Sequence, residues 1–233
     1  MMDLPFEQFP ALNAVGICRH VFTQRIPGID VSHDKAEVLE RLSAAHQEIR
    51  EATGFGDWPL FTAQQIHGNR IAVVDTIRSA LRADSGRRGA VSLPAHEFPR
   101  SDGIITNQRG VALGIYVADC CAVYIVDPKT PAIGLVHSGR KGSELGIVTN
   151  AVGQMSERFG SDPVHMIVQL SPCIRPPHYE VDFAAEIIRQ CRVLGVRNVR
   201  DCGTCTACDL RRYYSYRAEK GKTGRMLAVL GLA

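Results

Sequence analysis

The sequence predicts a single α+β domain, residues 1–233, in which mixed or antiparallel β-sheets are flanked by helices. Apolar, strand-like segments follow one another in long runs, most clearly over residues 103–139, and do not alternate strictly with helices. Amphipathic helical segments occur at a few places between these runs. The chain of 233 residues can bury a core, and its 45% hydrophobic and 22% charged residues are typical of globular proteins.

The first half of the chain alternates between short apolar runs and one long amphipathic segment. The elements predicted there are a strand over 14–22, a helix that Ser32 and Asp34 can cap and that continues to about Thr53, and a strand pair over 60–66 and 70–74 that turns at 67–69. Residues 79–100 contain Gly, Pro, Ser and Arg without periodicity, which predicts a long mobile loop of the kind that often carries binding residues.

The second half is richer in apolar runs. The predicted elements are strands over 103–106, 111–118, 122–127, 132–137 and 164–170, a helix over 143–159, an irregular Pro-rich segment over 171–177, a helix capped by Asp182 that ends near Leu194, a helix from Asp209, and a strand over 226–232.

Two of these strands, 122–127 and 132–137, flank the turn Pro128-Lys129-Thr130-Pro131 and are expected to form a hairpin. If Asp127 pairs with Ala132, His137 lies opposite Ala122. Cys120 lies two residues before Ala122 and therefore on the same face, diagonal to His137 at a Cβ–Cβ distance of roughly 7 Å. Cys121 points to the other face, so the spacing nominates Cys120 as the partner of His137.

A third ligand of the same class, His67, follows the apolar run over 60–66. Two His and one Cys form the set that a catalytic zinc uses when its fourth position stays open for water or substrate. Each residue alone has a structural alternative, since free Cys is usually buried in a core and a single His usually has a hydrogen-bonding role. Asp119 could orient a ligand or accept a proton, or it could cap a strand end.

The turn His137-Ser138-Gly139-Arg140-Lys141-Gly142 places two cations ahead of a helix N-terminus. Backbone N–H groups, the helix dipole and Arg140 or Lys141 could together bind phosphate. The alternative is a solvated turn, because the pattern is not a Walker loop.

The eight cysteines also include Cys202, Cys205 and Cys208, which have the C-x2-C-x2-C spacing of iron–sulfur proteins. Position 212, where a fourth Cys would be expected, is Arg, so we predict reduced thiols and no iron–sulfur cluster. A structural zinc here would need a ligand from elsewhere in the chain. No G-x-G-x-x-G follows a strand, which argues against a dinucleotide cofactor.

Charge and hydropathy limit the partners and the compartment. The net charge of +3 is small and the cationic residues are dispersed, so nucleic acid is not an expected partner. The first residues lack a basic and an apolar region of a signal peptide, and no apolar run approaches the roughly 20 residues needed to cross a bilayer. Eight cysteines without an export signal favour reduced thiols, and we expect a cytoplasmic protein without membrane association.

Several short motifs occur in a fixed order along the chain. They are Gln-x-His-Gly, Asp-Gly-x-x-Thr, Ala-Asp-Cys, Val-His-x-Gly, Pro-Cys-Ile with Tyr-Glu-Val, Ser-Tyr-Arg and Thr-Gly-Arg. This set resembles the YfiH-like family, also called laccase-domain or multicopper polyphenol oxidoreductase proteins, whose members are purine nucleoside phosphorylases with adenosine deaminase side activity. The resemblance implies zinc ligation by His67, Cys120 and His137 and a phosphate-facing role for Arg140 and Lys141.

The chain also departs from the family pattern. Arg140 stands where the family usually has Trp, Lys141 stands where it has Arg, and Ser171 replaces a Gly. Thr23 and Arg25 match part of the family's Ser-Thr-Arg opening, which makes Arg25 a candidate for substrate binding.

Together with the predicted metal site, the resemblance implies a zinc-dependent purine nucleoside phosphorylase that cleaves adenosine, inosine or methylthioadenosine with phosphate, with Cys120, His137 and Asp119 as the reacting groups. Adenosine deamination is a further activity that the same metal could support. An alternative is a Cys–His hydrolase or deamidase with Cys120 as nucleophile and His137 as base, and His67 separates the two because only the zinc site needs a third ligand. Copper-dependent phenol oxidation is a third, less favoured hypothesis, since copper sites of that kind need many His ligands. A non-catalytic metal-binding role is a fourth hypothesis.

Overall fold

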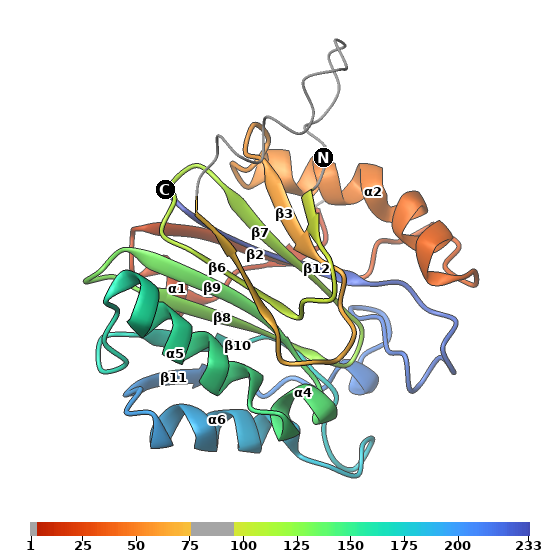
Figure 1. Ribbon diagram of the computed structural model, residues 1–233. Coiled ribbons are helices and arrows are strands. Elements are labelled where there is room, and N and C mark those ends of the chain that lie inside the picture. Colours follow the sequence, from red (N-terminus) through yellow and green to blue (C-terminus); the bar gives the residue numbers. More distant parts are fainter. Residues whose placement is uncertain (1–3, 76–95) are drawn as a thin grey trace.

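The computed structural model describes residues 4–75 and 96–233, and two mixed β-sheets form its centre (Figure 1). Within the described residues each sheet has six strands. The first has the order β1 (Phe6–Glu7), β2 (Cys18–Thr23), β12 (Met226–Leu232), β7 (Ala112–Val117), β3 (Leu60–Ala63), β5 (His96–Phe98). The second has the order β11 (Asn198–Asp201), β10 (Ile167–Leu170), β8 (Cys121–Asp127), β9 (Ala132–Ser138), β6 (Gly103–Thr106), β4 (Ile71–Val74). The predicted α+β class is confirmed.

The helices are α1 (Pro10–Asn13), α2 (Lys35–Ala52), α4 (Arg140–Glu144), α5 (Ile147–Phe159) and α6 (Phe183–Val193), with a 3-10 turn η1 (Thr206–Cys208). The three longest of these helices, α2, α5 and α6, pack against the two sheets, and the short α1 contacts a strand of each. Helices α5 and α6 lie side by side on the second sheet, whereas α2 lies beside the first (Figure 1). The predicted caps are present, because Asp34 accepts from Ala36 N and Glu37 N at the start of α2, and Asp182 accepts from Ala185 N at the start of α6.

Side-chain alternation along β8 divides the interior into two cores. Even-numbered residues such as Tyr124 pack between the two sheets, and odd-numbered residues such as Val123 pack under α5 and α6. Because both faces of β8 are covered, all seven of its residues are buried and the strand reads as a continuous apolar run.

The predicted pairing of the strands near 60–66 and 70–74 is wrong. Strand β3 belongs to the first sheet and β4 to the second, so residues 64–70 cross from one sheet to the other instead of forming a hairpin turn. Residues 118–120 make a similar crossing between β7 and β8. The two crossings bring His67 and Cys120 to the same end of the sheets.

Three other predictions need correction. The strand predicted over 14–22 begins only at Cys18, because Gly16 turns the chain with a φ of 73°. The helix predicted over 143–159 is two helices, α4 and α5, separated at Gly146, whose φ is 69°. The helix predicted from Asp209 is absent, and turns occupy that segment.

The mobile loop predicted over 79–100 lies mainly outside the described residues, and where it is described it includes β5. Among residues 4–75 and 96–233, no helix has both the length and the apolar character needed to cross a membrane.

Candidate metal centre and pocket

The hairpin has the register that the sequence predicts. Asp127 pairs with Ala132, and Ala122 pairs with His137. Cys121 lies in the core under α5 and α6, whereas Cys120 packs with the core between the sheets. The one-residue alternation therefore places the Cys120 thiol, and not that of Cys121, on the side of His137.

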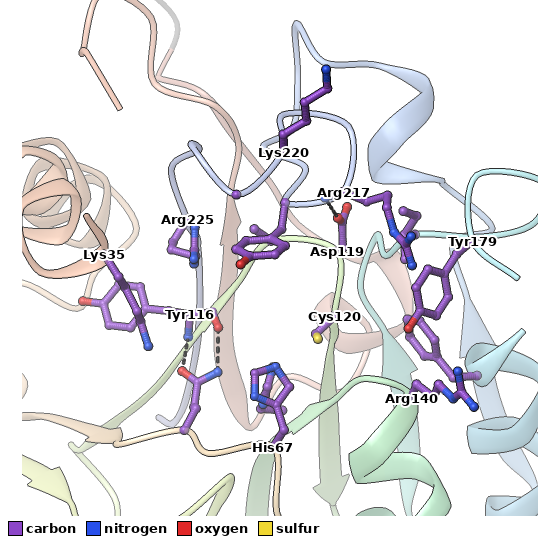
Figure 2. A pocket seen from close by; sticks show the side chains of 17 residues that line it. Lys35, His67, Tyr116, Asp119, Cys120, Arg140, Tyr179, Arg217, Lys220 and Arg225 are labelled. Carbon is purple, nitrogen blue, oxygen red and sulfur yellow. Dashed lines mark hydrogen bonds between the residues drawn. The ribbon is translucent and has the colours of Figure 1, made fainter. Parts of the chain in front are cut away.

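His67, Cys120 and His137 form a compact group of side chains that could hold a metal ion. One ligand atom of each lies within 4.8 Å of those of the other two. The two imidazole rings meet edge to face, with centroids 4.8 Å apart and an interplanar angle of 74°. Figure 2 shows Cys120 and His67 directed toward one another at the centre of the pocket.

Asp102, immediately before β6, contacts two of these residues. Its fully buried carboxylate accepts hydrogen bonds from the backbone N–H groups of Ile66 (3.2 Å), His67 (2.8 Å) and Gly68 (2.8 Å). These bonds hold His67 at a φ of 59°, in the left-handed region that non-glycine residues seldom adopt. The same carboxylate lies 2.9 Å from His137 Nδ1.

The contact with Asp102 determines which nitrogen of His137 can bind a ligand. Burial opposes ionisation of Asp102, but hydrogen bonds from His137, Gly68 and Ile66 outweigh it and lower its pKa, so the carboxylate is charged and Nδ1 of His137 donates. Nε2 is then the nitrogen left for a metal. Ligating histidines are commonly oriented by a carboxylate in this way.

Cys120 and His137 shift one another's protonation. Burial raises the pKa of the Cys120 thiol, but the positive charge of His137 and hydrogen bonds from both histidines outweigh burial and lower that pKa to about 6. Burial lowers the pKa of His137, and the Cys120 thiolate and Asp102 together raise it to about 9. Cys120 is therefore a thiolate at neutral pH, which is the form that binds metals and attacks carbonyl groups.

Gly139 makes room for the Cys120 thiol. A Cβ atom added at Gly139 would overlap with Cys120 Sγ. This close approach gives a physical reason for the glycine of the Val-His-x-Gly motif.

The three residues stand on the wall of a cavity of about 640 Å³. Its cationic lining residues are Lys35, Arg140, Arg217, Lys220 and Arg225. Its aromatic lining residues are Tyr116, Tyr179, Phe183 and Tyr216. In Figure 2, Arg140 and Tyr179 stand on one side of the Cys120–His67 pair, and Lys35, Tyr116 and Arg225 stand on the other. The cavity has the size and mixture of aromatic and polar groups of a small-molecule site.

The cations differ in their partners. Arg140 bonds Glu144 at 2.9 Å, and Arg217 lies 3.2 Å from Glu180. In the described part of the chain, no carboxylate lies within 4.0 Å of the charged nitrogens of Lys35 or Arg225. Burial, together with the nearby Arg225 charge, lowers the pKa of Lys35. Two cations on one wall without acidic partners are suited to an anion.

The structure brings some of the other predicted site residues to the cavity and leaves others outside it. Asp119 and Arg140 line it, but both carboxylate oxygens of Asp119 are occupied, by Thr206 Oγ1 at 2.7 Å and Arg217 N at 2.7 Å. Lys141 is exposed on α4 and is not a lining residue. Arg25 is also outside the lining and bonds Glu219 at 2.7 Å.

Several lining or supporting residues had no role in the sequence interpretation. Asp102 begins the Asp-Gly-x-x-Thr motif, and Arg217 and Arg225 end the Ser-Tyr-Arg and Thr-Gly-Arg motifs. The motifs therefore contained these three residues, but nothing in the sequence indicated what each of them does. Nothing in the sequence predicted that Lys35 lines the cavity, because a lysine is ordinary at the first position of a helix.

Comparison with known proteins identifies the family. The family described as "Multi-copper polyphenol oxidoreductase laccase" matches residues 13–187 and 181–233. The chain belongs to this family. It is 28% identical to purine nucleoside phosphorylase YlmD of Bacillus subtilis, over 93% of this chain and 85% of that protein. It is 26% identical to a purine nucleoside phosphorylase of Corynebacterium glutamicum, over 92% and 94% of the two chains.

Two solved structures share the fold of this chain. The crystal structure of the hypothetical protein YfiH of Bacillus licheniformis superposes with a TM-score of 0.79 at 20% identity, covering 100% of this chain and 98% of the other. YlmD from Geobacillus stearothermophilus gives 0.78 at 23% identity, covering 99% of each chain.

The donor atoms can be tested against the metals that this family suggests. Two imidazoles and one thiolate fit a zinc ion with an open fourth position. Copper sites with the same donors usually add an axial Met, and no Met is among the described residues that line the cavity. The arrangement fits zinc better than the copper of the family's descriptive name.

Proposed function

We propose that the protein is a zinc-dependent purine nucleoside phosphorylase that cleaves adenosine, inosine or methylthioadenosine. The observation that carries this proposal is the combination, in one cavity, of the His67–Cys120–His137 group with cations that lack acidic partners. A phosphorolytic enzyme needs both an electrophilic centre and a place for a dianion, whereas a hydrolase needs no anion site.

In this proposal the phosphate lies against Lys35 and Arg225, near the metal-binding group. Arg225 is held in place because its guanidinium donates to the carbonyl oxygens of Thr223 (3.0 Å) and Gly224 (2.8 Å). Arg225 and Tyr216 are in cation–π contact at 5.7 Å, and Arg217 and Tyr179 at 4.9 Å. These paired aromatic rings offer flat surfaces on which a purine could stack.

The bonds exchanged in phosphorolysis define what the residues do. An oxygen of phosphate forms a bond with C1′ of the ribose, the bond from C1′ to the purine nitrogen breaks, and its electron pair goes to the purine, which takes up a proton. Lys35 and Arg225 hold and orient the phosphate, while Asp102 keeps His137 Nδ1 protonated and its Nε2 free to bind metal. When bound by His67, Cys120 and His137, zinc supplies a Lewis acid to the charged reactants.

Adenosine deamination is a second activity that we propose for the same cavity. It replaces the amino group on C6 of the purine with oxygen from water and releases ammonia. Because phosphate takes no part, deamination should depend less on Lys35 and Arg225 than phosphorolysis does.

One observation favours a different candidate, a Cys–His hydrolase or deamidase. Asp102, His137 and Cys120 form a chain of carboxylate, imidazole and thiolate like that of a cysteine hydrolase. His67 and the unpartnered cations have no role in such a mechanism, and for this reason we place it second.

Product analysis tests the proposal directly. Zinc-loaded protein is incubated with adenosine, with and without phosphate. We expect adenine and ribose 1-phosphate only when phosphate is present. Release of ammonia from a glutamine-containing peptide, with adenosine unchanged, would instead support the hydrolase.

A pair of lysine variants locates the phosphate. We expect Lys35→Ala to raise the KM for phosphate about tenfold or more, which corresponds to one charge-assisted contact of roughly 1.4 kcal/mol, with a smaller change in the KM for nucleoside. Lys141→Ala is the matched control, since this exposed lysine lies outside the lining. If Lys141→Ala has the larger effect, the anion is bound at the turn before α4, as the sequence suggested.

A further inference from the structure

A second group of metal-binding side chains lies outside the cavity lining. His178, Cys205 and Cys208 each offer one ligand atom, and these atoms lie within 4.8 Å of one another. His178 Nδ1 is 3.8 Å from Cys205 Sγ and 3.6 Å from Cys208 Sγ. The sequence run of three cysteines lacked a fourth ligand, and His178, which is 27 residues from Cys205 in the sequence, is the additional donor.

The spacing of these atoms matches a tetrahedral metal site. With Zn–S bonds of about 2.3 Å and Zn–N bonds of about 2.0 Å, a regular tetrahedron has S···N edges of about 3.5 Å. The two observed S···N distances lie within 0.3 Å of that edge. The third edge, between the two Sγ atoms, is within 4.8 Å, compared with about 3.8 Å in the same tetrahedron, so a single ion can reach all three atoms if the two thiols approach one another by at most about 1 Å.

The backbone around the group is fixed independently of any metal. Cys173 and Cys205 form an isolated parallel bridge, in which Cys173 N donates to Thr204 O and Thr206 N donates to Cys173 O, both at 3.2 Å. On the other side, His178 N donates to Arg175 O at 2.9 Å. The bridge holds the segment that carries the two thiols against the Pro-rich segment that carries the histidine.

We propose that His178, Cys205 and Cys208 bind a second thiophilic divalent ion of the zinc class, with the fourth position left to water. Cys205 is buried, while Cys208 and His178 are exposed, so the site is open to solvent on one side. All three cysteines of the run are free thiols, and Cys202 is not part of the group. The imidazole donor and the absence of a further thiolate from this group distinguish it from an iron–sulfur site.

The ion would stabilise one wall of the cavity. Thr206, next to Cys205, donates from Oγ1 to Asp119 at 2.7 Å, and Ile174 N donates to Asp119 O at 2.8 Å. Tyr179, which follows His178, and Ile174, which follows the bridged Cys173, line the cavity. An ion bound by His178 and the two thiols would link residues 174–179 to Asp119 through Thr206. Asp119 directly precedes Cys120, a proposed ligand of the first metal centre.

Metal analysis of variants tests this proposal without reference to activity. We expect about two zinc ions per chain in the wild-type protein and about one in each of two variants of exposed ligands, Cys208→Ala and His178→Ala. Cys202→Ala is the matched control, because it removes a thiol of the same run outside the group and should keep both ions. Cys120→Ser should lose the other ion, which shows that the two sites fill separately.

Cobalt substitution gives a second readout. The sulfur-to-cobalt absorption should fall to about a third in Cys208→Ala if that variant empties the whole second site, since one of three ligating thiolates then remains. Hydrogen exchange should rise over residues 173–180 in the same variant and stay unchanged around His137. Wild-type metal content in both Cys208→Ala and His178→Ala would overturn the proposal, as would a Cys205–Cys208 disulfide in protein that holds one zinc. Stoichiometric iron with broad visible absorption would also overturn it.

Discussion

Replacing Asp102 with Asn removes one charge while keeping the size of the side chain, and it should weaken metal binding at the first centre. Oδ1 of Asp102 accepts from His67 N and lies 2.9 Å from His137 Nδ1, and Oδ2 accepts from Ile66 N and Gly68 N. The amide of Asn has a single oxygen, so it can accept the hydrogen bonds made to Oδ1 or those made to Oδ2, but not both sets.

Either orientation of the amide is unfavourable. With its oxygen at the Oδ1 position, the NH2 group faces the N–H groups of Ile66 and Gly68. With the oxygen at the Oδ2 position, the NH2 group faces His137, which can accept only by moving its proton from Nδ1 to Nε2. A protonated Nε2 cannot bind zinc, so the second orientation removes a ligand.

The expected loss is 10- to 100-fold in zinc affinity, the range typical of carboxylates that orient a ligating histidine, or about 1.4–2.7 kcal/mol. Competition with a chromophoric chelator measures the affinity of the first site, in the Cys208→Ala background so that one site remains. Asp127→Asn is the matched control, since Asp127 is also buried and its Oδ1 accepts from Lys129 N and Thr130 N at the other end of the hairpin. Affinity within about twofold of wild type in Asp102→Asn would refute this account of Asp102.

Two further predictions concern packing and acid stability. Gly139→Ala should strongly reduce zinc binding at the first centre, because the new Cβ would displace Cys120 Sγ at an overpacking cost of about 1–3 kcal/mol. Gly153→Ala is the control, since a Cβ there meets nothing within 4 Å, and it should leave zinc binding unchanged. Equal zinc contents in the two variants would contradict this prediction. Burial lowers the pKa values of His20 and His46 from 6.5 to about 4, so the unfolded chain binds two protons that the folded chain does not. The contribution of these two histidines to the free energy of unfolding should therefore be fully present above about pH 6.5 and be lost on acidification toward pH 4, by up to about 2.7 kcal/mol per pH unit. Urea unfolding across that range measures the slope, which His46→Leu should halve, and a flat profile in the wild-type protein would show that these pKa values are not lowered.

The hairpin, and with it the pairing of Cys120 with His137, could be predicted from sequence because local rules govern both; the approach of His67 could not, because it depends on the crossing of residues 64–70. A four-residue turn fixes the register between β8 and β9, and side-chain alternation then separates Cys120 from Cys121. The caps Asp34 and Asp182 were also visible, since each precedes an amphipathic segment and bonds only its own helix.

Long-range placement was beyond such rules. A short polar segment between two apolar runs is compatible with a hairpin or with a crossing between sheets, and residues 64–70 make the crossing. The roles of Asp102 and His178 depend on neighbours that are distant in the sequence, across the β6–β9 pairing and the Cys173–Cys205 bridge. Neither pairing has a local sequence signal.

The central claim is that His67, Cys120 and His137 bind the metal ion that the proposed reaction requires. Zinc content measured in parallel on Cys120→Ser and Cys121→Ser tests it most directly, because the two cysteines are adjacent in the sequence but face opposite sides of the strand. Cys120→Ser should lose the zinc ion of this centre and Cys121→Ser should keep it. Equal zinc contents in the two variants would contradict the assignment.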